Sequence, residues 1–552
     1  MKLHLAPPGT NQAAANDSAV LDEAHVGHIN GALGTITHGD TAPRKGLSLK
    51  TKTLLAIIGP GLIVMAGDND AGAFSTYSQA GQNYGTHLVW TLLLLVPVLY
   101  VNQEMVLRLG AVSGVGHARL ILERFGKFWG AFSVIDLFIL NALTIVTEFI
   151  GISLAVSYLG LPKVPTVIFA AVAVIGAVST GSFRRFERLC LMLVVGSLLV
   201  IPLFLLVHPP VGDVARSFVV PGLPHGQLPT VMLLIIAIVG TTVAPWQLFF
   251  QQSYIVDKRI TPRWINYERV DLMIGIVIVI VGGVALMAVS AAAFGGTPGF
   301  GNFTDAGGTA AGLARYVSRT AGDLFAIALI DAAIIGAAAV GLSTAYATSD
   351  VLGYNHSLHR PITQAKGFYA CYAGLMAVAA ALVLTPHAPL GLLTQGVQVL
   401  AGVLLPSASV FLLLLCNDKA VLGPWVNGRK LNMLTATIVW VLVLLSVILT
   451  ASVLFPNITG AQIIDVLVGG MVLGIGVGSF LLIQARSRRD VVTVNDVLAE
   501  VPDRATWRMP PLQRLQRPTM SMQRKVGLFT LRAYLAVAFI LVIVKIVEVA
   551  VK

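Results

Sequence analysis

Long apolar segments dominate this sequence and constrain its fold more than any other feature. Between residues 54 and 485 the chain repeats runs of about 20 or more mostly apolar residues, each able to cross a hydrocarbon layer of roughly 30 Å as a helix. A membrane barrel would show short alternating strands of about ten residues instead. The chain is 56% hydrophobic and 11% charged, whereas soluble domains have about 25% charged residues. We therefore predict an all-α, polytopic membrane protein.

The apolar runs predict twelve membrane helices. They cover approximately residues 54–82, 86–109, 129–158, 163–182, 187–208, 229–255, 269–294, 323–350, 367–386, 389–416, 432–455 and 461–485. A cytoplasmic N-terminus places most loop Lys and Arg residues, such as those of the run Arg184–Arg188, on the inner side, as the positive-inside rule requires. Residues 526–549 are also long and apolar, and the pattern leaves open whether they form a thirteenth crossing or an interfacial helix.

These segments divide the chain into four regions. Residues 1–52 are polar and lack the apolar stretch of a signal peptide, so we predict a disordered cytoplasmic tail. Residues 53–416 hold helices 1–10 as the core, residues 417–485 hold helices 11 and 12, and residues 486–552 combine a basic linker with the last apolar helix. The net charge of +11 follows from the inner loops, so the lipid bilayer, and not a nucleic acid, is the expected partner.

The stretch GDNDAG, residues 67–72, interrupts the first apolar segment near its centre. An ionisable side chain there costs roughly 2.5 to 3.5 kcal/mol on insertion scales, so Asp68 and Asp70 should face a protein interior or a water-filled cavity. An intact helix would point these two carboxylates in different directions, whereas an extended segment would align them. Binding of one ion by both carboxylates therefore requires unwinding to begin before Asp68.

The sixth apolar segment has a similar interruption, in which Gly240, Thr241, Thr242 and Pro245 stand near mid-membrane. Pro245 lacks an N–H and its ring clashes with the carbonyl four residues back, so the carbonyl of Thr241 is left free. Interrupted helices at corresponding places in two halves are typical of a transporter site built on inverted five-helix repeats. Helices 1–5 should then mirror helices 6–10.

The chemistry of these breaks suits a cation. Carbonyls at the ends of half-helices carry partial negative charge, and a neighbouring carboxylate adds a full charge. We expect Asp70 to bind the ion, the alternative being a carboxylate that only caps the second half-helix. Asp68 is either a second ligand or a structural carboxylate. The Thr241 carbonyl and the side chains of Gln247 and Gln395 are expected either to bind the ion or its retained waters or merely to line the site.

Helix 3 carries a polar stripe of its own. Asn141, Thr144 and Glu148 are spaced three and four residues apart, so they should face the bundle interior together. Glu148 is expected either to line the inner path or to be a hydrogen-bonded structural group.

The first apolar segment contains Gly59-Pro60-Gly61, followed by Asp70-Ala71-Gly72-Ala73. These motifs resemble the helix 1 pattern of the Nramp family of divalent-metal transporters, Gly-Pro and then Asp-Pro-Gly-Asn, and the resemblance extends over roughly residues 50–455. The runs 103–116 and 147–151 resemble its helices 2 and 3, Ala244-Pro245-Trp246-Gln247 falls on its Met-Pro-His-Asn, and Thr394-Gln395 falls on its Ser-Gln. The resemblance implies a LeuT-like fold, an inverted five-helix repeat with broken helices 1 and 6.

The departures from the family pattern are informative. Ala73 replaces the metal-binding Asn, and Ala244 replaces a Met whose thioether is a soft ligand for transition metals. Trp246 and Ile145 replace a His and an Asp of the family's proton route. These losses are similar to those of the Nramp-related magnesium transporters. We expect Asn69, Ala73, Trp246 and Glu148 to line the pathway, with Trp246 as a volume filler against the scaffold and not a cation contact.

The resulting prediction is uptake of Mg²⁺, Mn²⁺ or both across the plasma membrane by alternating access, without proton coupling. Mg²⁺ dehydrates reluctantly and requires oxygen ligands, which fits a site without a thioether. The alternatives are a proton-coupled Mn²⁺ or Fe²⁺ carrier and a metal sensor that does not transport. The sequence contains no phosphate-cradling loop, zinc-binding His pair or activated nucleophile pattern, so we expect neither an enzyme nor a resident cofactor, and no obligatory protein partner.

Overall fold

The computed structural model is almost entirely helical. It describes residues 23–224, 228–385, 390–455, 458–487, 503–515, 527–529, 533, 536 and 540. Within this part, ten helices are long and apolar enough to cross a membrane, and a bent pair of helices near the N-terminus adds an eleventh span. The predicted all-α membrane fold is confirmed, and each of the twelve predicted segments has a helical counterpart.

The first half of the bundle contains α2 (Leu47–Ile57), α3 (Pro60–Asp68), α4 (Ala71–Tyr84), α5 (Trp90–Ser113), α6 (His117–Phe125), α7 (Lys127–Tyr158), α8 (Lys163–Val178), α9 (Phe183–Gly196), η2 (Ser197–Leu199) and α10 (Val200–Val207). The second half contains α11 (Val211–Val219), α12 (Leu228–Thr242), α13 (Pro245–Asp257), η3 (Pro262–Trp264), α14 (Ile265–Phe294), α15 (Ala306–Tyr316), α16 (Arg319–Leu352), α17 (Lys366–Val383) and α18 (Leu390–Cys416). After these come α19 (Lys419–Leu422), η4 (Gly423–Trp425), α20 (Arg429–Leu454), α21 (Gly460–Ser487) and η6 (Leu512–Arg514).

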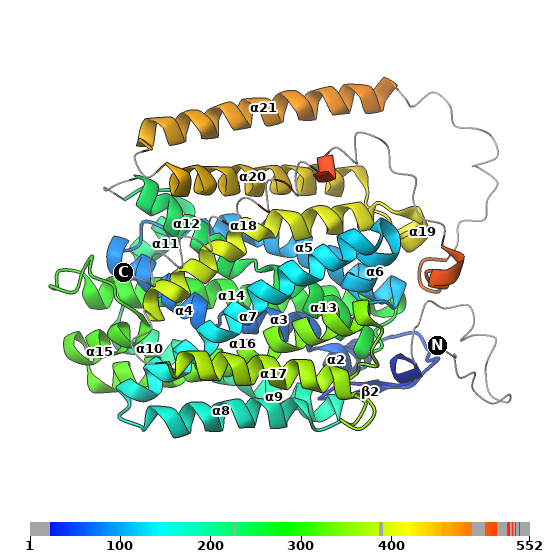
Figure 1. The fold of residues 1–552 in the computed structure, drawn as a ribbon, viewed down its shortest axis with the longest axis horizontal. Helices are drawn as coiled ribbons and strands as arrows, with labels where there is room; N and C mark the ends of the chain where they lie inside the picture. Colours follow the sequence, from blue (N-terminus) through cyan, green and yellow to red (C-terminus); the bar gives the residue numbers. More distant parts are fainter. Residues whose placement is uncertain are drawn as a thin grey trace.

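The long helices lie side by side, with α20 and α21 along one edge of the bundle and α8 and α9 along the other (Figure 1). The centre is formed by α7 packed on α16, α14 packed on α3 and α4, and α12 packed on α18. The close contact between α12 and α18 depends on glycine. A Cβ on Gly240 would lie only 2.1 Å from the backbone oxygen of Gln398 and 2.4 Å from the amide nitrogen of Gly402. Small residues allow membrane helices to approach this closely.

Helix 1 is interrupted twice. The predicted start near residue 54 falls within α2, and a 54° bend separates α2 from α3. Gly59 adopts a φ of 150° at the bend, and Pro60 opens α3. The Asp271 Oδ2 atom accepts hydrogen bonds from the amides of Gly59 (3.1 Å) and Gly61 (2.7 Å), which fixes the backbone there. The second interruption is the predicted one, at Asn69 and Asp70.

The N-terminal region differs from the predicted disordered tail. Residues 1–22 lie outside the described residues, but η1 (Glu23–His25) and a two-stranded antiparallel sheet, β1 (Ile29–Asn30) and β2 (Thr35–Ile36), fold against the helices. The polar, small-residue composition suggested disorder because it offers little apolar surface. The segment is instead ordered because its backbone oxygens accept hydrogen bonds from arginine side chains elsewhere in the chain, including Arg184 and Arg259.

The predicted C-terminal region is described only in part. Most of residues 486–502 and 516–552, including most of the apolar run 526–549, lies outside the described residues. Residues 503–515 contact the end of α5, where the Arg508 Nη1 atom donates to the Ala111 oxygen at 2.7 Å and the Met509 amide donates to the Val112 oxygen at 3.2 Å. Part of the basic linker therefore packs on the bundle.

His356, in the loop after α16, carries a pH-dependent interaction. Its Nε2 atom lies 3.2 Å from the Oδ1 atom of Asp350. Burial lowers the pKa of His356, but the hydrogen bond and charge of Asp350 outweigh it and raise the pKa to about 9.

The stabilisation by this pair should be complete below the unfolded-state pKa of about 6.5 and should be lost as the pH rises through about 9. We expect His356→Gln to lower the unfolding temperature at pH 6. The variant should also lose less of its unfolding temperature than the wild type as the pH rises from 6.5 to 9. Thermal unfolding of the purified protein across this range checks the prediction, and parallel curves for the two proteins would refute it.

Candidate cation site

The break in helix 1 is built by Asp70 and its neighbours. α3 continues through Asp68, and the backbone leaves the helix only at Asn69. Asp70 has an extended backbone and caps α4, where its Oδ1 atom accepts a hydrogen bond from the Ala73 amide at 2.8 Å. Asp70 is 3% exposed, so its carboxylate is buried in the protein interior. Asp70 therefore fulfils the capping role that we considered, and its position is also suitable for ion binding.

Glu148 of α7 approaches the same break. Its Oε2 atom accepts a hydrogen bond from the Ala71 amide at 3.1 Å, and the residue is fully buried. A Cβ on Gly336 of α16 would lie 2.8 Å from both the Cβ of Asp70 and the Oε2 of Glu148. The lack of a side chain at Gly336 thus allows the two acidic side chains to come together. Two carboxyl groups this close repel unless a proton or a cation neutralises one of them.

Threonine hydroxyl groups lie at the break in helix 6. α12 ends at Thr242 and α13 begins at Pro245, with Ala244 in an extended conformation between them. The Thr242 hydroxyl donates to the Ile238 oxygen at 2.6 Å and contacts the Tyr77 hydroxyl at 2.7 Å. Within the described residues, the buried Thr241 hydroxyl has no hydrogen-bond partner. The predicted interruption at Pro245 is present, and it places Thr241 in the last turn of α12.

Gln247 joins the two broken helices. Its Nε2 atom donates to the Oδ1 atom of Asp68 and, at 3.3 Å, to the Thr242 oxygen. Its Oε1 atom accepts from the Gln103 Nε2 atom of α5 at 2.8 Å. The side-chain amide is therefore directed by three partners, and Asp68 is held toward α13. Asp68 and Asp70 contact different neighbours here, because unwinding begins after Asp68 and not before it.

The α18 amide nearest the break is Gln398, one turn after the predicted Gln395. A Cβ on Gly72 would lie 1.9 Å from the Gln398 Nε2 atom and 3.1 Å from the Asp70 Oδ1 atom. Gln398 is 3% exposed, and its Nε2 atom has no hydrogen-bond partner in the described part of the chain. Gln395 is only half-buried. Helical spacing would have found Gln398, because residues three apart share a helix face.

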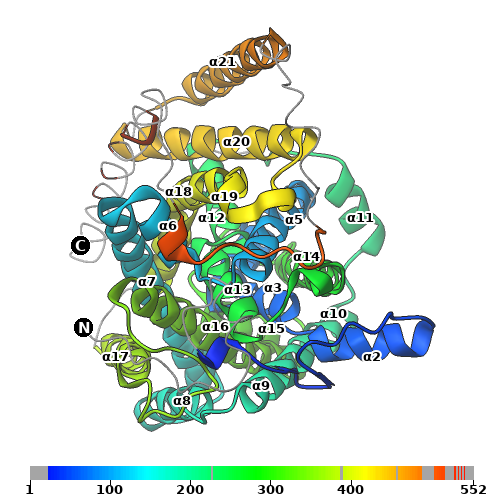
Figure 2. The same ribbon diagram turned by 90° about the vertical axis from the view of Figure 1, so that its right-hand side faces the viewer.

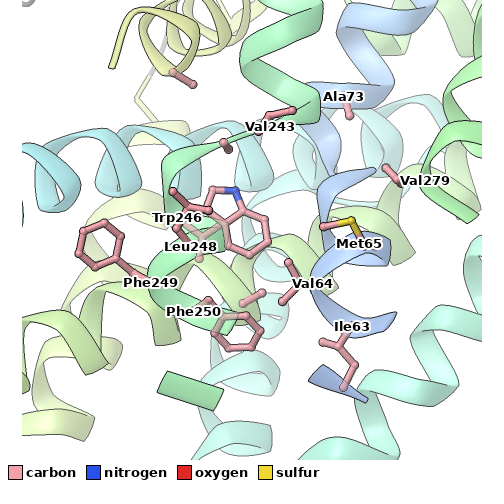
Figure 3. Close-up of a cluster of buried hydrophobic side chains, with 14 of the residues drawn as sticks. Ile63, Val64, Met65, Ala73, Val243, Trp246, Leu248, Phe249, Phe250 and Val279 are labelled. Carbon is pink, nitrogen blue, oxygen red and sulfur yellow. The ribbon is translucent and has the colours of Figure 1, made fainter. Parts of the chain in front are cut away.

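The remaining predicted pathway residues pack around the breaks. Trp246 is 1% exposed and its indole ring is directed toward Val64 and Met65 of α3 (Figure 3). Asn69 faces the other way, since its Nδ2 atom donates to the Val279 oxygen of α14 at 3.2 Å. Trp246 therefore fills space between α3 and α13, as a volume filler would.

The polar stripe on α7 faces α16. Asn141, Thr144 and Glu148 are all buried, and the Asn141 Nδ2 atom donates to the Thr344 hydroxyl at 2.9 Å. The stripe thus lies inside the bundle, with Glu148 at its end nearest the helix 1 break.

The assembled groups are hard oxygen donors. Asp70, Asp68 and Glu148 supply carboxylates and Thr241 supplies a hydroxyl, all of them buried. Gln398 places its Nε2 atom at the break, where it can donate to Asp70 or to a water of the ion. Among the described residues, no cluster of three or more His, Cys, Asp or Glu has the geometry to enclose a metal ion. An ion at the breaks would therefore be held by few carboxylates, by carbonyl, amide and hydroxyl oxygens, and by its own waters. Such a donor set favours Mg²⁺, Ca²⁺ or Mn²⁺ over soft metals.

Known proteins share this sequence and architecture. The family model described as "Natural resistance-associated macrophage protein-like" matches residues 61–452. The divalent metal cation transporter MntH of Ralstonia nicotianae is 29% identical over 410 residues, covering 71% of this chain and 88% of the relative. The MntH of Deinococcus radiodurans is 26% identical over 453 residues, covering 78% and 96%. These relatives are transporters and not enzymes.

A solved structure, that of the Eremococcus coleocola manganese transporter in complex with an aromatic bis-isothiourea substituted compound, has the same fold. It superimposes with a TM-score of 0.60 at 20% identity, covering 85% of this chain and 100% of the other. The fold agrees with the LeuT-like arrangement of broken helices 1 and 6 expected from the sequence. Because the family model covers most of the length, this chain belongs to the natural resistance-associated macrophage protein-like (Nramp) family.

Proposed function

We propose that the protein carries divalent metal cations into the cell, with Mg²⁺ as its preferred substrate and Mn²⁺ as a second one. The observation that carries the proposal is the buried Asp70 carboxylate at the break between α3 and α4, close to Gln398 and Glu148. A carboxylate at such a break in a two-fold repeat is suited to bind a cation at mid-membrane. The names of the MntH relatives support the general substrate class.

The preference for Mg²⁺ rests on two alanines at the breaks in helices 1 and 6. Ala73 and Ala244 contribute no side-chain ligand, so a bound ion would retain several waters. Mg²⁺ loses water reluctantly and is usually held through one or two carboxylates and its waters. Without the thioether, Cd²⁺ loses its preferred ligand, whereas Mn²⁺ still accepts oxygen. Asp68, Thr241, Gln247 and Gln398 would hold the ion or its hydration shell.

We further propose that uptake needs no coupled proton. At the positions where the family resemblance implies a proton route, Ile145 and Trp246 carry no carboxylate or imidazole. An inside-negative membrane potential favours cation entry by about 2.3 kcal/mol per charge per 100 mV. Entry of a divalent ion is therefore favoured by about 4.6 kcal/mol at 100 mV without a coupled proton. The protein would lie in the plasma membrane with its N-terminus in the cytoplasm, as the loop charges indicate.

A proton-coupled carrier of Mn²⁺ or Fe²⁺ is the second candidate, and one observation favours it. Glu148 lies beside Asp70 and is fully buried, so binding of a cation at Asp70 would favour release of a proton from the pair. Measuring the pH inside proteoliposomes during uptake separates the two. Acidification in proportion to the metal taken up would support the coupled carrier and reject the uncoupled one.

Restoring a soft ligand tests the assignment of the ion. Ala244 is 6% exposed, has an extended backbone and precedes Pro245 at the break. We expect Ala244→Met to strengthen Cd²⁺ competition against Mn²⁺ uptake by about tenfold, because the thioether suits softer ions. Ala244→Leu is the matched control, since it adds similar volume without sulfur. Equal Cd²⁺ competition in the Met and Leu variants would place residue 244 away from the ion.

A further inference from the structure

The N-terminal segment, residues 23–46, is anchored to α9. The Ala32 amide donates to the Glu187 Oε2 atom at 2.5 Å, and the Ala32 oxygen accepts from the Arg188 Nε atom at 3.1 Å. The Gly31 oxygen accepts from the Arg184 Nε atom at 3.0 Å. Three side chains on one face of α9 therefore hold the backbone between β1 and β2.

The same segment is bound at the end of α13 and at η3. The Arg259 side chain donates to the oxygens of Ala24 (2.7 Å) and His28 (3.1 Å). Further along, the Ala42 oxygen accepts from the Arg263 Nη2 atom at 2.9 Å. The segment thus crosses from the second half of helix 6 to α9 and on to η3.

Its third contact is with α2, the helix that leads into α3. A Cβ on Gly31 would lie 2.0 Å from the Ala56 oxygen, and a Cβ on Gly34 would lie 3.0 Å from the Ala56 Cβ. Two glycines therefore allow the hairpin to rest directly on the α2 backbone. Figure 2 shows the N-terminal segment running beside α9 to α2.

A buried ion pair connects this hairpin to the bend before α3. The Glu187 Oε1 atom lies 2.7 Å from the Lys258 Nζ atom, and both side chains are fully buried. Lys258 also donates to the oxygens of Ile57 (2.5 Å) and Ile58 (2.9 Å). The Glu187 carboxylate therefore binds two groups at once. One oxygen accepts from the N-terminal hairpin, and the other pairs with Lys258, which binds the end of α2.

We propose that residues 23–46 form a strap that holds the α2–α3 unit against α9 and α13 and keeps the inner side of the carrier closed. This inference rests on the proposed function for its role in transport. Release of an ion from the break toward the cytoplasm requires α3 to separate from its neighbours on the inner side. Separation breaks either the contact of Gly31 and Gly34 with Ala56 or the bonds of the strap to α9, so the strap stabilises the inward-closed state.

Two variants weaken the strap at different contacts. Gly31→Val places a side chain against the Ala56 carbonyl, and Arg188→Gln replaces the guanidinium donor to the Ala32 oxygen by a shorter, uncharged side chain. Leu33→Ala is the control within the same hairpin, because the Leu33 side chain is 58% exposed. None of these residues lies at the breaks in helices 1 and 6, so the ion-binding groups stay intact.

Hydrogen–deuterium exchange of the full chain in nanodiscs tests the strap without requiring transport. Gly31→Val and Arg188→Gln should each speed exchange of the α3 amides, residues 61–68, by about tenfold, while the α16 amides stay unchanged. Leu33→Ala should match the wild type. Wild-type exchange in α3 for both weakened variants would overturn the proposal.

Flux then tests the consequence for transport. A population shift toward the inward-open state lowers the fraction of carriers able to bind an outside cation, so the outside KM for Mn²⁺ should rise several-fold in both variants. An unchanged KM in both would also overturn the proposal. Absence of flux in the wild type would reject the proposed function, and the exchange measurement would still decide whether the strap holds α3.

Discussion

Asp70→Asn should reduce divalent-cation flux and cation binding to the background of protein-free liposomes. The substitution keeps an oxygen that can accept the hydrogen bond from the Ala73 amide, so the cap of α4 survives. It removes the negative charge, which is the strongest attraction that this buried break offers to a cation. A residue that only capped the helix would therefore be rescued by Asn, whereas a ligand would not.

The matched control is Asp331→Asn. Asp331 also lies within a membrane helix, but it faces Gly196 of α9, where a Cβ would come 2.2 Å from its Oδ1 atom. Removing this charge should leave flux near the wild-type value. Metal uptake and calorimetric binding should be measured for both variants. Wild-type flux in Asp70→Asn would remove Asp70 from the site.

Displacing the Gln398 amide should weaken cation binding by about 10- to 100-fold, the range seen when groups around a metal's ligands are lost. Gly72→Ala does this indirectly, because its Cβ would occupy the place of the Gln398 Nε2 atom. Gln398→Ala does it directly. Both changes act on the same Gln398 amide. The Gly72→Ala, Gln398→Ala double variant should therefore bind the cation about as tightly as whichever single variant binds it less tightly.

Gly67→Ala is the control for adding a methyl group to helix 1. Its Cβ would meet the Trp246 ring at 3.5 Å and Ala339 at 3.7 Å, which are ordinary contacts. Binding should therefore be close to that of the wild type. Additive losses in the Gly72→Ala and Gln398→Ala pair would show that the two residues act separately and would contradict the arrangement of this site.

The sequence allowed prediction of the membrane helices and of the breaks at Asp70 and Pro245, but not of the bend at Gly59. Apolar length identifies each span, and residues that a membrane helix tolerates poorly, Asp68, Asp70 and Pro245, mark the interruptions. The exact point of unwinding was not predictable, because the hydrogen bond from Gln247 retains Asp68 within α3. That bond joins residues far apart in the sequence.

Contacts between distant segments account for the other differences. Thr394-Gln395 matched a family motif, but the side chain that reaches the break is that of Gln398, because the rotation of α18 is set by packing on α12 at Gly240. The order of the N-terminal segment depends on Glu187 and Arg188, which lie 155 and 156 positions from Ala32. The composition of the N-terminal segment alone does not predict contacts with residues so distant in the sequence.

The residues that replace the soft and proton-binding groups of the family are buried. Trp246 packs against α3, and Ala73 and Ala244 contribute no side-chain ligand. The proposed choice of a hard cation therefore rests on ligand chemistry.

The most direct test of the account is uptake into proteoliposomes that contain the purified chain and a pH probe, with an inside-negative potential. Mg²⁺ and Mn²⁺ should enter at rates that increase with the potential, Cd²⁺ should be a poor substrate, and the internal pH should stay constant. Uptake of Cd²⁺ in preference to Mg²⁺, accompanied by internal acidification in proportion to the metal taken up, would contradict it.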